Sequence, residues 1–299
     1  MTTSDPDPRW YHRLFVAFQF ILPQHLLSGT MYRITRVELR PIKALFIRLF
    51  IRAFRVDMTE ALQPDPGHYP SFNAFFTRAL KPDARPFPSS SHALLCPADG
   101  ALSQCGTIED GRIFQAKGRD YGLSDLLGGE PRWTERFAGG SFATIYLSPR
   151  DYHRVHMPMG GDLKGMLHIP GRLFSVNPIT TRLVPRLFAR NERVACLFDG
   201  EQGAIGLVLV GAIFVGSMET VWAGQVTPPP GRPMSRWCYD QCEPTRHLER
   251  GDEMGRFNMG STVILLLPPG RIRWDSELKP GDTVRMGQQI GTLLDPADQ

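Results

Sequence analysis

The amino-acid sequence predicts an α+β protein that is mostly β, with an N-terminal helical region ahead of a β-rich core. Three observations predict this class. Long stretches of large apolar residues occur before residue 56. From residue 94 onward, short apolar runs punctuated by glycine are typical of strands. The 299 residues include 42% hydrophobic and 21% charged residues, an ordinary balance that excludes a disordered or fibrous chain.

The N-terminal region is basic. Residues 1–56 carry nine Lys or Arg and three Asp or Glu, a balance of +6, whereas the whole chain has a net charge of +4. The first apolar stretch, residues 10–27, is interrupted by Pro23 and diluted by glutamine and histidine, so it is a poor transmembrane candidate. The second, residues 41–55, starts with a proline, which is favoured at the first position of a helix.

The second stretch predicts an amphipathic helix. Arg48, Arg52 and Arg55 are spaced by four and then three residues, so they share one helical face, while Phe, Ile and Leu occupy most other positions. Such a helix can lie in a membrane interface with its arginines at anionic headgroups. The alternative is a helix that packs its apolar face on the protein's own core. We favour an anionic membrane surface as a partner, because two such segments exceed what a domain of this size needs.

Cysteine usage predicts a reducing environment. The five cysteines are an odd number in a chain without a cleavable secretory signal, so we expect free thiols. Cys238 and Cys242 are spaced like metal ligands, but no second pair accompanies them, and we expect no metal. With the basic helices, this predicts a peripheral protein on the cytoplasmic face of the cell membrane. Nucleic acid is not an expected partner, because the basic residues are interleaved with apolar ones.

The rest of the chain is expected to form one domain. Residues 57–70 are rich in proline and predict a linker, and residues 71–78 predict a short capped helix. We place the boundary so that residues 1–62 form the helical membrane-associating region and residues 63–299 form the β-rich domain. Strands are expected at residues 143–147, 206–215 and 263–267.

The C-terminal residues 279–291 resemble the hairpin of barrel-sandwich domains, a class that includes biotinyl and lipoyl carriers. We therefore expect a barrel-sandwich-like β core. An exposed carrier lysine in a Met-Lys-Met setting does not occur in the sequence, which argues against a carrier function.

The step Gly260-Ser261 stands at the entrance of the expected strand 263–267. The strand would hold Ser261 firmly, and glycine before the serine allows strained backbone geometry. This is what attack of the serine hydroxyl on the Gly260 carbonyl would need. The alternative is an ordinary turn that leads into a core strand.

Asp99, His156 and Ser261 form a candidate catalytic triad. A carboxylate would orient an imidazole, and the imidazole would activate the hydroxyl. Histidine is suited to accept and return a proton near neutral pH. His153 and His156 are three residues apart, so they cannot both face the same side of a strand. Each of these residues has a structural alternative as a hydrogen-bonded side chain.

Four segments, in this order along the chain, resemble phosphatidylserine decarboxylase: Pro97-Ala98-Asp99-Gly100, Asp151-Tyr152-His153-Arg154-Val155-His156, Leu173-Phe174-Ser175-Val176-Asn177-Pro178 and Met259-Gly260-Ser261-Thr262. Residues 72–78 and 115–118 are also similar to segments of this family. The combination is far more specific than any single segment. Met259 departs from the leucine that is usual in the family, and the two side chains have similar volumes, so we expect no functional change.

The resemblance implies that the chain makes its own cofactor. Ser261, deprotonated by His156 with Asp99 behind it, would attack the Gly260 carbonyl, and β-elimination with loss of ammonia would leave a pyruvoyl group in place of Ser261. The products are a β chain, residues 1–260, and an α chain, residues 261–299. A homodimer of such α/β pairs is expected, with no metal.

The resemblance also implies the second reaction. The pyruvoyl carbonyl would form a Schiff base with the amine of phosphatidylserine in the membrane and act as an electron sink for loss of carbon dioxide, which gives phosphatidylethanolamine. His153 is expected to transfer a proton or to position the carboxylate in this step.

Two other functions use the same residues. A membrane-associated Ser-His-Asp lipid hydrolase would use the same three side chains, although the Gly-x-Ser-x-Gly elbow does not occur at Ser261. A non-catalytic barrel-sandwich binding protein would keep the Gly260-Ser261 bond intact.

Overall fold

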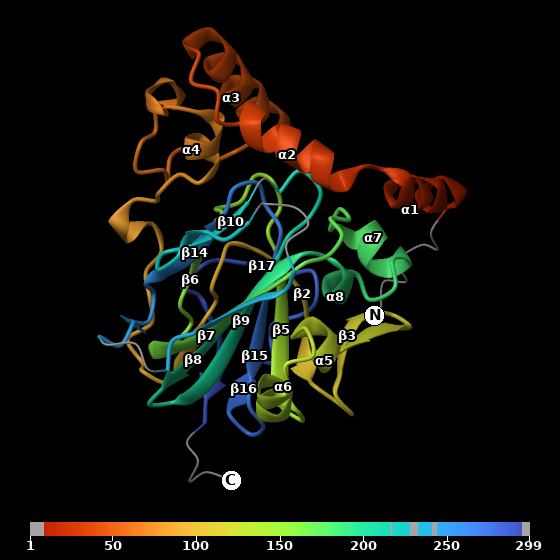
Figure 1. The fold of residues 1–299 in the computed structure, drawn as a ribbon. Helices are drawn as coiled ribbons and strands as arrows, with labels where there is room; N and C mark the ends of the chain where they lie inside the picture. The colour runs from red at the N-terminus through yellow and green to blue at the C-terminus, as the bar shows by residue number, and fades with distance from the viewer. Residues whose placement is uncertain (1–8, 216, 228–232, 241–243, 295–299) are drawn as a thin grey trace.

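The computed structural model describes residues 9–215, 217–227, 233–240 and 244–294, and it has the expected α+β architecture with mostly sheet (Figure 1). The helices are α1 (Trp10–Ile21), α2 (Gln24–Ile34), α3 (Arg40–Phe54), α4 (Phe72–Phe76), α5 (Leu123–Leu126), α6 (Pro131–Phe137), α7 (Pro178–Leu183) and α8 (Leu187–Arg190), with 3-10 turns η1 (Pro66–His68) and η2 (Pro82–Ala84).

The largest sheet has nine strands, of which eight follow the order β12 (Ser235–Cys238), β7 (Gly161–Ile169), β8 (Arg193–Gly200), β9 (Gly203–Val210), β15 (Thr262–Leu267), β5 (Ser141–Tyr146), β2 (Gly100–Thr107) and β17 (Thr283–Val284), while β13 (His247–Leu248) pairs with β7. A second sheet has the order β11 (Gly224–Gln225), β10 (Met218–Thr220), β14 (Glu253–Phe257) and β6 (Arg154–His156). The smaller sheets are β1 (Ala93–Leu95), β18 (Gln289–Leu293) and β16 (Ile272–Trp274), and the pair β3 (Arg112–Ala116) and β4 (Arg119–Gly122).

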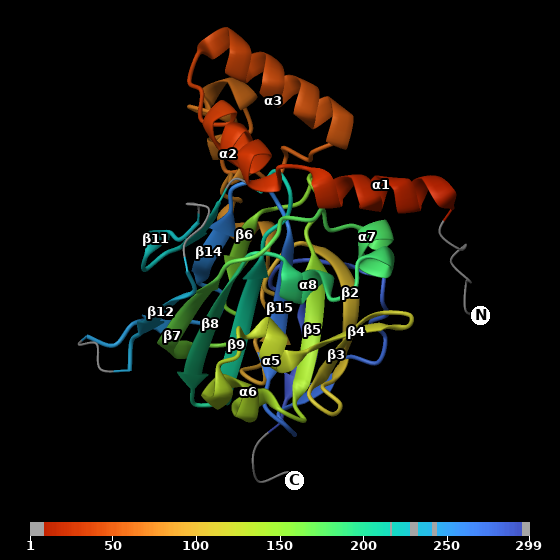
Figure 2. The ribbon, with the colours of Figure 1, turned by 45° about the vertical axis from the view of Figure 1, so that its right-hand side comes forward.

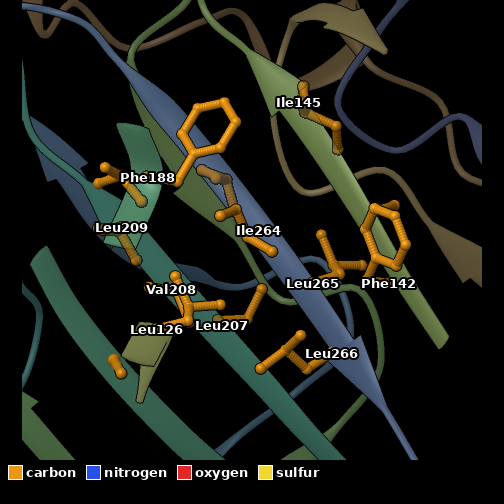
Figure 3. Close-up of a cluster of buried hydrophobic side chains, with 14 of the residues drawn as sticks. Leu126, Phe142, Ile145, Phe188, Leu207, Val208, Leu209, Ile264, Leu265 and Leu266 are labelled. Atoms are coloured by element: carbon orange, nitrogen blue, oxygen red, sulfur yellow. The ribbon is translucent and has the colours of Figure 1, made fainter. Parts of the chain in front are cut away.

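The expected strand 263–267 is β15, a central strand of the largest sheet. It pairs antiparallel with β5 on one side and β9 on the other, and all six of its residues are buried. Because both faces are covered, its sequence is a continuous apolar run rather than an alternating one. Figure 3 shows side chains of β15, β9 and β5 gathered in this core. The strand is therefore a rigid support for the residue that precedes it.

The strands form open sheets, and the barrel-sandwich expectation is wrong for the described residues, since their strand order does not close into a barrel. The two strands expected to form the C-terminal hairpin do not pair with each other. β17 pairs with β2, whereas β18 pairs with β1 and β16. The residues between β17 and β18 instead bind Cys96, which directly follows β1. Gly287 N donates to the Cys96 carbonyl at 2.9 Å, and Cys96 N donates to the Gln288 carbonyl at 2.7 Å.

Helices α1, α2 and α3 lie together above one end of the largest sheet (Figures 1 and 2). Their breaks are close to those predicted, because Pro23 separates α1 from α2 and α3 starts one residue before Pro41. Among the described helices, none alone is long and apolar enough to cross a membrane. The pair α1 and α2 meets those criteria of length and composition together, but the two helices meet at an 83° bend.

Helix α3 has two apolar faces. One packs on an aromatic cluster, which we define as the buried residues Ile47, Val56, Tyr69, Phe72, Phe75 and Phe76. Ile42, Leu45 and Leu49 are instead 53 to 60% exposed. Arg48 and Arg52 are exposed as well. The helix thus packs on the protein's own core and also presents an apolar surface flanked by arginines to the solvent.

Other expectations were met more loosely. The expected helix at residues 71–78 is α4, and Ser71 caps it by accepting a hydrogen bond from Ala74 N at 3.2 Å. The expected strand 206–215 is β9, which ends at Val210. Helices α5 to α8 were not predicted, because segments of four to seven residues carry too few turns to show a helical period.

Candidate active site

The Gly260-Ser261 bond lies at the entrance of β15. The carbonyl of Ser261 accepts a hydrogen bond from Leu147 N at 2.7 Å, which continues the pairing of β15 with β5 by one residue. Ser261 is 2% exposed, and its Oγ is buried without a hydrogen-bond partner. A buried hydroxyl that makes no hydrogen bond is costly, so Ser261 Oγ lacks the partner that a purely structural serine would normally have.

The backbone strain expected at Gly260 occurs one residue earlier. Met259 has φ = 126°, a value that side chains with a Cβ rarely adopt, whereas Gly260 is not among the positive-φ residues of the described chain. Such a conformation costs about 1–3 kcal/mol and persists only where the surroundings enforce it. Here the Met259 side chain packs against the aromatic cluster. The strain is therefore held next to the bond that the sequence predicts to break.

His153 faces Gly260. A Cβ built on Gly260 would lie 2.8 Å from His153 Nε2, so only glycine fits beside this ring. His153 Nδ1 is 2.8 Å from the carbonyl oxygen of Asp151, which can only accept, so Nδ1 carries the proton and Nε2 is the free base. That Nε2 is buried without a partner. Two unsatisfied polar atoms, His153 Nε2 and Ser261 Oγ, thus adjoin the same glycine.

The surroundings keep His153 neutral. The ring is fully buried, and burial, with a further contribution from the nearby charge of Arg78, lowers the pKa of His153 to about 3. The Phe76 ring covers it, with 4.0 Å between the ring centroids. At neutral pH, His153 is therefore an imidazole that can accept a proton at Nε2.

His156 has a different environment. Its Nδ1 donates to the carbonyl of Gly251 at 2.7 Å, and its Nε2 accepts from the Tyr152 hydroxyl at 2.9 Å. Burial lowers the pKa of His156 as well. The rings of His153 and His156 thus have different hydrogen-bond partners, and only His156 belongs to strand β6.

Asp99 is held by a network of ion pairs. Arg85 binds both carboxylate oxygens of Asp99, with Nε at 3.0 Å from Oδ1, and it also pairs with Glu60 at 2.8 Å. Met286 N donates to Asp99 Oδ1 at 2.8 Å. Arg285 completes the network by pairing with Glu60 at 2.8 Å.

The structure does not assemble the predicted triad by direct contacts. Within the described part of the chain, no hydrogen bond joins Asp99 to His156 or His156 to Ser261. His153 is the predicted residue that adjoins the Gly260-Ser261 bond. The roles of Asp99, His156, His153 and Ser261 in catalysis remain predictions.

The site suits a prosthetic group made from residue 261. The space beside Gly260 that a side chain would fill is taken by a histidine nitrogen without a hydrogen bond, and the serine hydroxyl next to it is also free of partners. For a metal, the described residues contain no group of three or more His, Cys, Asp or Glu placed to bind one. Cys238 is exposed, and Cys242 lies outside the described residues.

Sequence reasoning missed several residues of this site. Glu60 comes from the segment predicted to be a linker, and neither Arg85 nor Tyr152, the partner of His156, was singled out. Phe76 was expected only as part of a capped helix, but its ring packs on His153. The density of phenylalanine at residues 72–76 was the available signal, since such a dense cluster needs a buried partner.

The fold and the site define the class: an α+β protein with a buried Gly-Ser peptide bond beside a buried, neutral histidine. A family model described as phosphatidylserine decarboxylase matches residues 72–292, and a second, described as PSD, matches residues 14–55. The chain therefore belongs to the phosphatidylserine decarboxylase family.

Individual relatives are similar over nearly their whole length. The phosphatidylserine decarboxylase proenzyme of Bordetella pertussis is 57% identical over 278 residues, which cover 93% of this chain and 94% of the relative. The proenzyme of the same name from Azotobacter vinelandii is 55% identical over 280 residues, 93% of this chain and 98% of the relative. The one from Pseudomonas fluorescens is 54% identical over 286 residues, 95% and 99% of the two chains. These names give no support to the hydrolase and binding-protein alternatives.

Proposed function

We propose that this protein cuts itself between Gly260 and Ser261 and then decarboxylates phosphatidylserine to phosphatidylethanolamine. The observation that carries the proposal is the pair of buried, unsatisfied atoms beside Gly260, His153 Nε2 and Ser261 Oγ. The name proenzyme, which the relatives share, supports a processed chain.

In the first reaction, Ser261 Oγ attacks the carbonyl carbon of Gly260. The C–N bond breaks, the serine nitrogen takes up a proton, and the two residues are joined by an ester. Loss of the Ser261 α-proton breaks the bond between Cβ and Oγ, so that Gly260 leaves as a carboxylate. Uptake of one water and release of ammonia complete the pyruvoyl group at residue 261. Strain at Met259 favours this reaction, because it raises the energy of the uncut chain.

For the base in the first reaction, the predicted triad of Asp99, His156 and Ser261 is the first candidate. It requires His156 Nε2 to exchange the Tyr152 hydroxyl for Ser261. His153 is a second candidate, favoured by its free Nε2 beside Gly260.

In the second reaction, the pyruvoyl group supplies an electron sink for the loss of carbon dioxide. His153 is placed to move a proton at residue 261, because it faces the neighbouring residue and is neutral. Its burial beneath the Phe76 ring keeps bulk water away from the position where the proton is transferred.

Intact mass under denaturing conditions tests the first reaction. We expect two masses that sum to the full chain plus one water and minus one ammonia, the smaller one matching residues 261–299. Ser261→Ala should give a single mass for the whole chain. A single mass for the wild-type protein, or a cut Ser261→Ala variant, would refute self-cleavage at this bond.

The substrate lies in a bilayer, and the N-terminal helices suit contact with one. Large apolar side chains of α1 are exposed, among them Trp10 at 75%, Leu14 at 61% and Phe18 at 54%. Together with the exposed apolar row of α3, they support a peripheral protein on the anionic, cytoplasmic face of the membrane. A homodimer of processed α/β pairs is the assembly we propose with it.

Vesicle binding tests this surface. Replacing Arg48, Arg52 and Arg55 by glutamine should weaken binding to anionic vesicles by roughly 3 kcal/mol in total, because each basic residue near such a surface contributes about 1 kcal/mol. Binding to neutral vesicles serves as the control and should change little. Equal binding of the variant and the wild type to anionic vesicles would contradict the proposed surface.

A further inference from the structure

Arg78 is a buried cation without an acidic partner. It follows α4, is 4% exposed, and takes part in no ion pair within the described residues. Its Nη2 donates to the carbonyl of Arg150 at 3.2 Å, while its Nε is buried and makes no hydrogen bond. A guanidinium has five N–H donors, so most of the binding capacity of Arg78 is unused.

Other arginines around the site are paired. The pairs are Arg85 with Asp99 and Glu60, Arg154 with Glu253 at 2.8 Å, Arg256 with Glu253 at 2.7 Å, and Arg36 with Glu219 at 3.8 Å. Burial of a charge without a partner is costly. A buried cation that is kept in a site without a partner is therefore a candidate for binding an anion.

Arg78 lies beside His153. It is two residues after Phe76, whose ring packs on His153, and its acceptor Arg150 belongs to the same loop as His153. Its charge also contributes to the low pKa of His153. An anion bound to Arg78 would therefore lie close to the histidine that faces Gly260.

The acidic residues near Arg78 are satisfied by other donors. Asp99 binds Arg85 and Met286 N, and Asp151 accepts hydrogen bonds from the backbone and the hydroxyl of Ser148, each at 2.7 Å. They act on Arg78 only over longer distances. The guanidinium lies over the Phe75 ring, with Cζ 5.6 Å from the ring centroid, and no carboxylate of the described residues pairs with its remaining donors, which can bind an incoming anion.

The substrate of the proposed function offers two anions, a carboxylate and a phosphate. A cation on the carboxylate would stabilise the charge that is lost with carbon dioxide, so it would bind the substrate more tightly than the transition state and slow the reaction. A cation on the phosphate meets the same charge before, during and after the reaction. The phosphate is therefore the ligand that suits Arg78.

We propose that Arg78 binds the phosphate of the phosphatidylserine headgroup. The proposal rests on the proposed function, and it gives Arg78 a role in binding rather than in the chemical step. Neither Lys117, which is exposed, nor Arg154, which is paired with Glu253, offers the same combination of burial and free donors.

The test compares Arg78→Met with Arg150→Met, an exposed cation of the loop that carries His153, in the matured enzyme. The substrate is a short-chain phosphatidylserine, and the competitor is a short-chain phosphatidylethanolamine, which keeps the phosphate and lacks the carboxylate. For Arg78→Met we expect KM for the substrate and Ki for the competitor to rise together by about 10- to 100-fold, with kcat within about twofold. Arg78→Lys should fall between, and Arg150→Met should match the wild type.

Three outcomes would overturn the proposal. Unchanged KM and Ki would remove Arg78 from headgroup binding. A higher KM with unchanged Ki would assign Arg78 to the carboxylate. A chain that stays uncut in Arg78→Met, while the wild type is cut, would assign it to maturation. An uncut wild type would instead refute the proposed function itself, so the two failures are distinguishable.

The thermal midpoint of Arg78→Met should equal or exceed that of the wild type, since an unpaired buried charge is removed.

Discussion

Two polar regions lie near the Gly260-Ser261 bond, and they differ in whether their buried polar groups have hydrogen-bond or ion-pair partners. Around Asp99, carboxylates and arginines are bound to one another and to backbone groups, in a network that includes Glu60, Arg85 and Arg285. Beside Gly260, His153 Nε2 and Ser261 Oγ are buried and unsatisfied. A saturated network stabilises a fold, whereas unsatisfied groups are costly and are the ones available to react. We therefore expect Arg85 and its ion-pair partner Glu60 to hold the site in place, and the two unsatisfied groups beside Gly260 to react.

The largest effects are expected from the two histidines, His153 with its unsatisfied Nε2 and His156 with both ring nitrogens bonded. His156→Ala should leave the chain uncut, because the predicted triad loses its base. His153→Ala should be cut and then lose decarboxylation by about 10²- to 10⁴-fold, the usual contribution of a proton-transfer residue. Intact mass measures the first effect and release of carbon dioxide the second. The reverse pattern, with His153→Ala uncut and His156→Ala cut, would make His153 the base of self-cleavage.

The ion-pair network around Asp99 should contribute to the free energy of unfolding. Arg85→Met leaves Asp99 and Glu60 without their shared partner, and we expect a loss of about 3–5 kcal/mol in the free energy of unfolding. Urea unfolding of the uncut Ser261→Ala chain measures it. The control is Arg112→Met, which breaks an exposed, solvent-screened pair with Asp120 and should cost far less stability than Arg85→Met. Similar losses in both variants would show that the Asp99 network is no stronger than a surface pair.

A smaller, pH-dependent effect is expected from Phe76→Leu. Removing the ring admits water to His153, so its pKa rises from about 3 toward its ordinary value of 6.5. Decarboxylation needs the neutral imidazole, and the variant should therefore lose activity as the pH falls below about 6, whereas His153 in the wild type stays neutral there. The ratio of kcat/KM at mildly acidic and neutral pH measures this effect.

Phe72→Leu is the matched control for Phe76→Leu. Phe72 belongs to the same aromatic cluster and packs on Phe46 and Phe50, with ring centroids 4.6 and 5.0 Å away. Its loss should lower stability without changing the pH ratio. Equal pH ratios in the two variants would mean that Phe76 does not control the protonation of His153.

The sequence predicted the elements that depend on local pattern. The apolar run of β15, the proline at Pro23 and the cap at Ser71 each act within a few residues, and each was found close to its expected place.

The sequence could not predict what depends on pairing over long distances. The C-terminal segment looked like a hairpin because its glycines are spaced like one, but backbone groups of Cys96 and β2 provide its partners. Arg85 reaches Asp99 across 14 positions, and Arg285 reaches Glu60 across 225. Which histidine faces Gly260 likewise depends on how the loop before β6 packs on Phe76, which spacing alone does not encode.

The proposed cut between Gly260 and Ser261 would be a one-way process, because β15 lies in the middle of the largest sheet. Residues 261–299 contribute β15, β17 and β18, which pair with β9, β5, β2 and β1 of the longer piece, and β16, which pairs with β18. These pairings form while the chain is continuous, when the strand is already tethered to its neighbours. After the cut, two separate chains would have to find each other, at an additional cost of about 4–15 kcal/mol in lost freedom of motion. Once cut and then denatured, the two pieces would therefore not readily re-form the native strand pairings.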